Sequence, residues 1–294
     1  MFIPEKFSLA ADLQEVIKFI AKLKAYSKIP EQVFKVNLDL DKVEHIDIGA
    51  ISLLLSSIKE LALKNIKVQG NLPKHPACEQ YIIDSGFLEH LNILSSTVKR
   101  KINTIENESR NSMLMNGRDK TDHRRIGQCI KTSMKKICGY ERHYQPLYGV
   151  IGEMNINSLE HAYRRNKHWL FAVNFEKKTE KLIFTFTDNG YGIYTRLKRN
   201  FGLKAFELLG LTTELKIVEG MFDEKYNSRF KKQYNRNKGL PAIKALQEKK
   251  KVTNLIIITN KVYINFATGE KIQLENDFSG TFYYWELDKN VING

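Results

Sequence analysis

The chain has 294 residues, and its 47 Lys and Arg against 33 Asp and Glu give a net charge of +14. A hydrophobic fraction of 42% excludes wholesale disorder. There is no apolar run of membrane-spanning length, no secretion-signal pattern and no CxxC pair among the three cysteines, so we expect a cytoplasmic protein without membrane contact. The positive charge suits nucleic acid or acidic lipid without establishing either.

The first part of the chain alternates between helix and strand patterns. The elements predicted in chain order are a helix over 9–23, a strand over 33–38, a helix over 50–63, a strand over 66–68 and a helix over 77–84. Gly86 follows the third helix, where a left-handed cap suits a glycine. This order predicts a small α/β domain over residues 1–95.

Residues 96–121 are predicted to be a polar, basic linker. The stretch 103–120 is rich in Asn and Ser and only weakly periodic, which is typical of a linker or mobile loop. Between Ser95 and Tyr140 there are 11 Lys and Arg against 4 Asp and Glu. The linker therefore carries part of the excess positive charge.

Residues 122–294 contain a second set of helix and strand patterns. The predicted elements are a helix after Asp122, a helix over 147–164, strands over 169–175 and 182–187, an irregular region over 190–238, a helix over 239–249, and strands over 254–260, 262–266 and 282–287. This order predicts a second domain of the α+β class.

Three short segments of this second domain carry candidate chemistry. On the 147–164 helix, Glu153, Asn157 and His161 are spaced four residues apart, so they share one face and suit a site that positions water and a hard cation. Such a stripe also occurs on ordinary solvated helices, and His161 fits either interpretation. The segment alone leaves both interpretations open.

The other two segments surround the irregular region. Asp188 leaves a strand into Gly190 and Gly192, which can present a carboxylate to a cleft, although Asp-Asn-Gly is also an ordinary turn signal. Lys238 and Gly239 open a helix, whose free N–H groups attract phosphate. Pro241 in the first helical turn fits a simple helix start as well.

At these residues the chain resembles the GHKL (Bergerat-fold) superfamily, the histidine-kinase-like ATPase domains. The matching boxes are Glu153 to Asn157, Asp188-x-Gly190-x-Gly192, Lys238-Gly239 and Gly280-Thr281, in the family's order over about residues 122–288. The third box normally has glycine where Asn237 stands. That departure argues against efficient turnover.

The resemblance implies an ATP site with Mg²⁺ as cofactor. It implies that Asn157 binds the Mg²⁺ that bridges the phosphates, and that Asp188 accepts the adenine amino group with support from Thr281. Gly190, Gly192 and Gly239 would let the lid, the segment between Gly190 and Lys238, fold over the phosphates, with Lys238 as a donor. Glu153 would orient or deprotonate the attacking water.

The first domain resembles the STAS fold of anti-sigma-factor antagonists over about residues 43–91. The stretch 45–51 leads into a helix, and Ser85-Gly86-Phe87-Leu88 lies near the end. The phosphorylatable Ser of the signalling members is replaced by Ile48 and Gly49, with Ser52 one turn later. We therefore expect a docking or dimerisation module that engages a protein partner.

Nucleic acid stays a candidate partner through the basic lid and linker. From Arg196 to Lys251 there are 15 Lys and Arg against 6 Asp and Glu, and aromatic residues interleave with them at Tyr226, Phe230 and Tyr234. This pattern equally fits a solvated surface, a clamp on ATP phosphates or a short lid helix. No zinc spacing or hydrolase elbow is present in the sequence.

These observations lead to three functional hypotheses. The first is a Mg²⁺-dependent GHKL-type ATPase that acts as a nucleotide-driven conformational switch. The second is an anti-sigma-type serine/threonine kinase that phosphorylates a separate STAS-like protein. The third is a non-enzymatic adaptor in which nucleotide stabilises the fold. The family resemblance also implies a homodimer as one oligomeric state.

Overall fold

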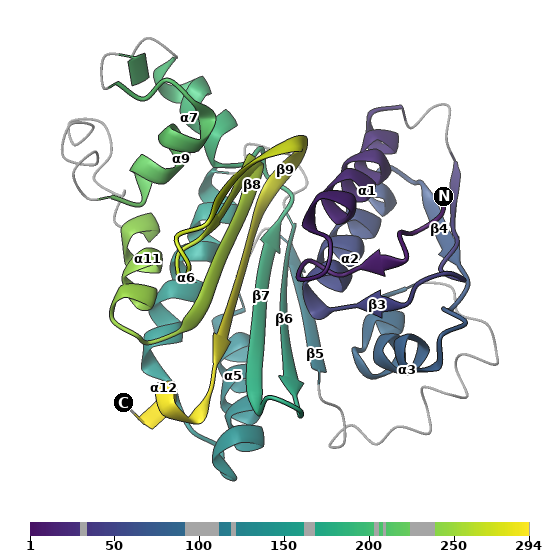
Figure 1. The fold of residues 1–294 in the computed structure, drawn as a ribbon, viewed down its shortest axis with the longest axis horizontal. Coiled ribbons are helices and arrows are strands. Elements are labelled where there is room, and N and C mark those ends of the chain that lie inside the picture. The colour runs from purple at the N-terminus through teal and green to yellow at the C-terminus, as the bar shows by residue number, and fades with distance from the viewer. Residues whose placement is uncertain are drawn as a thin grey trace.

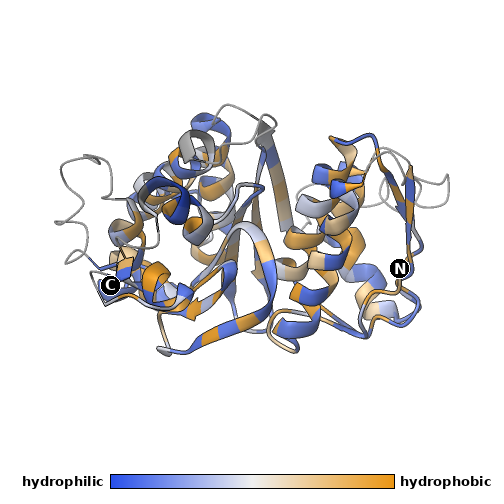
Figure 2. Cartoon of the chain, turned by 90° about the horizontal axis from the view of Figure 1, so that it is seen from above, coloured by the Kyte–Doolittle hydropathy of each residue, from blue (hydrophilic) through white to orange (hydrophobic). Residues whose placement is uncertain are grey.

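The computed structural model describes residues 1–29, 34–91, 112–118, 122–161, 168–202, 206–207, 210–223 and 239–293. Its fold is mixed α/β, with three layers (Figure 1). A five-stranded sheet stands in the middle, helices cover one face, and the N-terminal unit (residues 1–91) covers the other. Figure 2 gives the same arrangement from above, with hydrophobic and hydrophilic residues banded along the helices as expected for amphipathic elements.

The N-terminal unit is a small parallel β/α arrangement. Its elements are β1 (Lys6–Phe7), α1 (Leu13–Ala25), β2 (Lys35–Leu38), β3 (His45–Ile46), α2 (Ile48–Ala62), β4 (Lys67–Gly70) and α3 (Pro76–Asp84), with single 3-10 turns at Tyr26–Lys28 and Phe87–His90. β1 pairs with β3 and β2 with β4, both in parallel. Gly86 has a φ of 75°, so the left-handed cap predicted from the sequence is confirmed.

The C-terminal unit (residues 112–293) contains the large sheet and its helices. Its elements are β5 (Ser112–Arg118), α5 (His123–Cys138), α6 (Gln145–His161), β6 (His168–Glu176), β7 (Lys181–Asp188), α7 (Ile193–Phe201), α9 (Glu214–Met221), α11 (Gly239–Glu248), β8 (Thr253–Asn265), β9 (Lys271–Leu287) and α12 (Lys289–Asn293). The strand order is β5-β6-β7-β9-β8, and every neighbouring pair is antiparallel.

The two faces of this sheet bury different sets of side chains. Because side chains alternate along a strand, Phe184 and Phe186 of β7 point to the helical layer, while Thr185 points to the N-terminal unit. On the helical side, Phe184 stacks on Trp285 at 5.5 Å between ring centroids. On the other side, Ser52 of α2 forms a buried 2.8 Å hydrogen bond with Thr185.

The N-terminal unit shares its core with the sheet. One continuous cluster of buried residues runs from α1 and α2 into the strands and includes Leu170, Ala172 and Phe282. Helix α2 is buried on nearly all sides because it lies between its own small strands and the large sheet; 13 of its 15 residues are buried. Units that the sequence predicts as separate domains therefore pack together through an apolar interface.

Several predicted boundaries were wrong. Residues 112–118 fall in the stretch predicted to be a linker, yet they form edge strand β5, because their pairing with β6 is a non-local contact. The region predicted to be irregular contains α7 and α9. The strands predicted at 254–260 and 262–266 are the single strand β8, interrupted by a register shift at Asn260. Of the strand predicted over 33–38, residue 33 lies outside the described residues.

The shared core predicts one cooperative unfolding transition. Phe282→Ala, which removes a fully buried ring from the interface between the units, should lower the free energy of unfolding by about 3–5 kcal/mol. Phe2→Ala is the matched control, because the Phe2 side chain is 77% exposed, and it should change stability by less than about 0.5 kcal/mol. Urea unfolding followed by circular dichroism measures both; two separate transitions in the wild type would contradict the shared core.

Candidate functional site

Asp188 is a buried carboxylate at the end of β7. Its Oδ1 accepts hydrogen bonds from the Gly190 N–H at 2.7 Å and the Thr281 N–H at 3.3 Å, and its Oδ2 accepts one from Ser158 Oγ at 3.1 Å. Burial raises the pKa of Asp188, while these hydrogen bonds and the charge of Lys24 oppose the rise. The site therefore contains a desolvated carboxyl group held in one orientation by three elements of the chain.

The stripe predicted on the 147–164 helix faces the start of α11. A Cβ added at Gly239 would stand 2.6 Å from Glu153 Oε2 and 3.3 Å from Asn157 Nδ2, so both side chains lie against this glycine. Asn157 Nδ2 is buried and has no hydrogen-bond partner within the described part of the chain. The His161 side chain lies outside the described residues, as does Lys238.

Gly192 is the N-cap residue of α7 and has a φ of 83°, and its close neighbour is a side chain of the protein. A Cβ at this position would stand 2.3 Å from Asn260 Oδ1. That oxygen accepts from the Tyr194 N–H at 3.0 Å, and Thr259 Oγ1 accepts from the Ile193 N–H at 2.9 Å. Side chains of β8 thus cap the first turn of α7, and the glycine is needed for this approach.

Gly280 makes a similar close approach behind Asp188. Its φ is 121°, and an added Cβ would stand 2.2 Å from the Asp188 carbonyl oxygen. Thr259 Oγ1 also donates to the Gly280 carbonyl at 3.0 Å. The Gly-Thr pair therefore lets β9 lie directly against the end of β7, which brings the Thr281 N–H to the Asp188 carboxylate.

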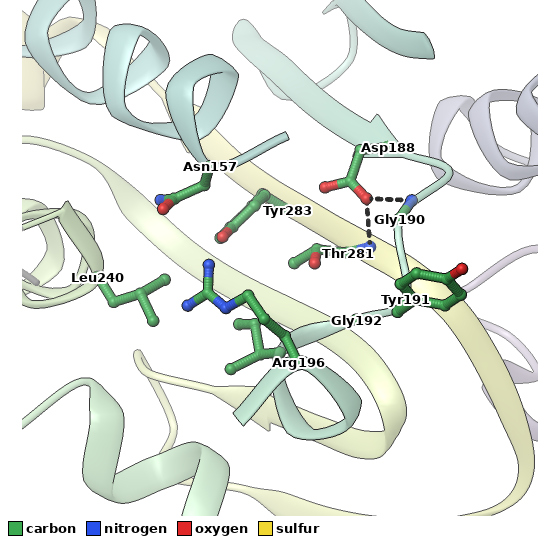
Figure 3. A pocket seen from close by; sticks show the side chains of 10 residues that line it. Asn157, Asp188, Gly190, Tyr191, Gly192, Arg196, Leu240, Thr281 and Tyr283 are labelled. Carbon is green, nitrogen blue, oxygen red and sulfur yellow. Dashed lines mark hydrogen bonds between the residues drawn. The ribbon is translucent and has the colours of Figure 1, made fainter. Parts of the chain in front are cut away.

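These segments line one cleft on the helical side of the sheet (Figure 3). The cleft is open to solvent, and its own cavity volume is about 20 Å³. Its lining residues are Asn157, Asp188, Gly190, Tyr191, Gly192, Ile193, Arg196, Leu240, Thr281 and Tyr283. Five of the residues predicted from the sequence are thus together, whereas Glu153 and Gly239 contact each other next to Asn157 without belonging to this lining.

The sequence interpretation missed Arg196, which it counted only as part of the basic lid. The residue lies in the first turns of α7, is 7% exposed, and points its guanidinium into the cleft toward Tyr283 in Figure 3. The positive charge of Arg196 also acts on the buried Tyr283 hydroxyl, whose pKa is raised by burial and partly lowered again by this charge. The signal for this residue in the sequence was its position four residues after Gly192, one turn into the helix that follows.

Arg199 and Tyr191 form a second contact at this end of α7. The Arg199 guanidinium carbon lies 3.9 Å from the centre of the Tyr191 ring, a cation–π geometry. Since Tyr191 lies between the two glycines, this contact fixes one side of the cleft lining.

The described residues can be compared with the cofactor and partner predictions. These residues contain no cluster of three or more His, Cys, Asp or Glu that could bind a metal, and no helix long and apolar enough to cross a membrane. The aromatic residues predicted to stack on nucleic acid, Tyr226, Phe230 and Tyr234, lie outside the described ranges. Nucleic acid, a protein partner and a homodimer stay predictions.

Comparisons with protein-family models, with curated proteins and with solved structures found no match. The GHKL and STAS resemblances therefore stay predictions that rest on the residues quoted for them.

The close approach at Gly280 predicts an unusually costly substitution. Gly280→Ala should destabilise the protein by about 3 kcal/mol or more, because it combines an unfavourable φ with a clash against the backbone at Asp188. Gly269→Ala is the matched control, since Gly269 has a φ of 76° with open space around it, and it should cost about 1 kcal/mol. Chemical unfolding of both variants tests this; equal losses would mean that the contact with Asp188 is easily relieved.

Proposed function

We propose that this chain binds ATP with Mg²⁺ in the cleft between α6, α7, α11 and the ends of β7 and β9. The observation that carries the proposal is the distribution of polar groups in one cleft. Asp188 supplies a buried acceptor, while Arg196 supplies a cation and Asn157 a buried N–H group without a partner in the described chain. A nucleotide has the complementary parts, an amino group on the base and anionic phosphates.

The Asp188 end suits the adenine base. A carboxylate accepts a hydrogen bond from an exocyclic amino group, whereas guanine would present a carbonyl oxygen at the corresponding position and repel it. The Thr281 N–H donates a hydrogen bond to the Asp188 carboxylate and helps to hold it in place. Burial strengthens the hydrogen bonds that this carboxylate accepts. These properties support adenine over guanine.

The opposite part of the cleft suits phosphate. A guanidinium binds phosphate oxygens through paired hydrogen bonds, so Arg196 is the natural phosphate contact among the described lining residues. Nucleotide-bound Mg²⁺ takes one or two oxygens from the protein and the rest from phosphate and water, so Asn157 Oδ1 fits as its protein ligand. The ion, when bound, would neutralise phosphate charge.

Two variants test the base end and the phosphate end of the cleft separately. Asp188→Ala should abolish binding of both ATP and adenosine, because both need the base acceptor. Arg196→Met should weaken ATP about 10- to 100-fold and leave adenosine within about twofold, because adenosine has no phosphate. Isothermal titration calorimetry with Mg²⁺ present measures these affinities, with GTP as the base control.

Three results would contradict the proposal. The first is a wild type that binds no ATP, and the second is GTP binding as tight as ATP binding. The third is an Arg196→Met variant whose affinities for ATP and for adenosine fall equally. Thermal unfolding of each variant without nucleotide separates a loss of binding from a loss of fold.

Hydrolysis is the reaction we propose for the bound nucleotide, with Glu153 as the group that orients or deprotonates water. Glu153 lies one helical turn before Asn157 and contacts Gly239 at the start of α11. A carboxylate at this position can act as a general base once a water molecule is within hydrogen-bond distance. Arg196 and Asn157 would meanwhile hold the phosphates.

One observation favours a second candidate, a nucleotide-controlled adaptor without turnover. Glu153 is absent from the ten described lining residues, and Asp188, the carboxylate among them, already accepts three hydrogen bonds. In that case nucleotide binding alone would change the protein's state, with no phosphate transferred to water or to another protein.

Glu153→Gln distinguishes hydrolysis from the adaptor function. The variant should bind ATP with wild-type affinity and lose phosphate release at least about 100-fold, because an amide cannot accept the proton of water. Release of labelled phosphate from γ-labelled ATP is the measurement. Wild-type turnover in the variant would exclude the role of Glu153, whereas binding without any turnover in the wild type would favour the adaptor. Label appearing on an added partner protein would instead indicate a kinase.

A further inference from the structure

A lysine of the N-terminal unit is buried against the strand that supports the cleft. Lys24, in the last turn of α1, has a side chain that is 7% exposed. Its Nζ donates a 2.6 Å hydrogen bond to the Ser279 carbonyl of β9, lies 3.4 Å from Glu60 Oε2 of α2, and stands 4.5 Å from the centre of the Phe278 ring. The cation thus joins α1 and α2 to β9.

The segment that Lys24 holds is the one that holds Asp188. Ser279 is followed by Gly280, which lies against the Asp188 carbonyl, and by Thr281, whose N–H donates to the Asp188 carboxylate. The Lys24 charge also acts directly on the Asp188 carboxyl group and lowers its pKa against the effect of burial. Two routes, one mechanical and one electrostatic, therefore connect α1 with the cleft.

We propose that Lys24 is a positioning residue for the cleft, which makes ligand binding there depend on how the N-terminal unit is docked. A buried lysine costs desolvation free energy, and an apolar side chain of similar length would fill the same space without that cost. What the lysine adds is a fixed position for the Ser279 carbonyl and a positive charge behind Asp188. The part that concerns nucleotide rests on the proposed function.

Coupling between two sites is reciprocal. A partner that pulls α1 away from β9 would remove Lys24 from Ser279, loosen the segment from Phe278 to Thr281 and weaken the ligand. A ligand that holds Asp188 and Thr281 in place would in turn favour the docked position of α1. The N-terminal unit is thereby a regulator of the cleft in the same chain.

The first arm of the test needs no nucleotide. Carboxyl NMR of the 294-residue chain follows the titration of Asp188, and amide exchange follows the Thr281 N–H. Lys24→Met should raise the pKa of Asp188 and speed exchange at Thr281. Lys22→Met is the matched control, because Lys22 is exposed on the same helix, and it should change neither. Among the described residues, the other titratable groups around Asp188 are Tyr283 and Arg196, which both variants retain.

Lys24→Gln is a second variant, which keeps the test decisive if Lys24→Met does not fold. Glutamine can still donate a hydrogen bond to the Ser279 carbonyl but has no charge, so it should raise the pKa of Asp188 with a smaller effect on Thr281 exchange. An unchanged pKa of Asp188 together with unchanged exchange at Thr281, in a folded Lys24→Met or Lys24→Gln protein, would overturn the proposal.

The second arm measures ADP and ATP affinity against pH. The pKa of Asp188 is raised, so protonation at falling pH removes the acceptor for the adenine amino group, and affinity should fall through that pKa. In Lys24→Met the fall should move to higher pH, and affinity at neutral pH should drop about tenfold. A wild-type protein that binds neither nucleotide would contradict the proposed function, while the NMR arm would still decide the role of Lys24. A Lys24→Met pH profile equal to the wild-type profile would overturn the positioning role.

Discussion

The five-stranded sheet has two apolar faces, and covering both is the constraint on which the rest of the structure depends. Phe184 and Phe186 need the helical layer on one side, while Leu170, Ala172 and Phe282 need α1 and α2 on the other. Each face buries enough hydrophobic surface to be costly if left in water. The N-terminal unit is therefore part of the core of the protein, and its helices α1 and α2 are already occupied by an intramolecular partner.

This double coverage places Asp188 where the three layers meet. The carboxyl group is desolvated because β7 ends inside the structure, and it is held by groups from α6, from β9 and from its own loop. Lys24 reaches the same region from the opposite face of the sheet. A buried charged group needs a counter-charge or hydrogen-bond partners. The charge of Lys24, at the interface between the units, therefore helps to stabilise the carboxylate of Asp188 in the cleft.

Local patterns were enough to predict most of the helices and several of the residues that lie together in the cleft. Helix α6, the turn after Asp188 and the left-handed Gly86 follow from spacing and from glycine conformation, which are properties of short segments. Strand β5 was missed because its strand character comes from pairing with β6. Arg196 was missed as a cleft residue because counting charges along a chain does not show which side chains point inward.

The sequence by itself determined which residues can do chemistry, because glycine at a sharp turn and a carboxylate after a strand are local requirements. The tertiary structure decided what these residues contact. It gave Gly192 the side chain of Asn260 as its close neighbour and placed Lys24 behind Asp188, 164 residues away in the chain. Such contacts depend on how whole layers pack, and no spacing within a single segment encodes the position of another layer.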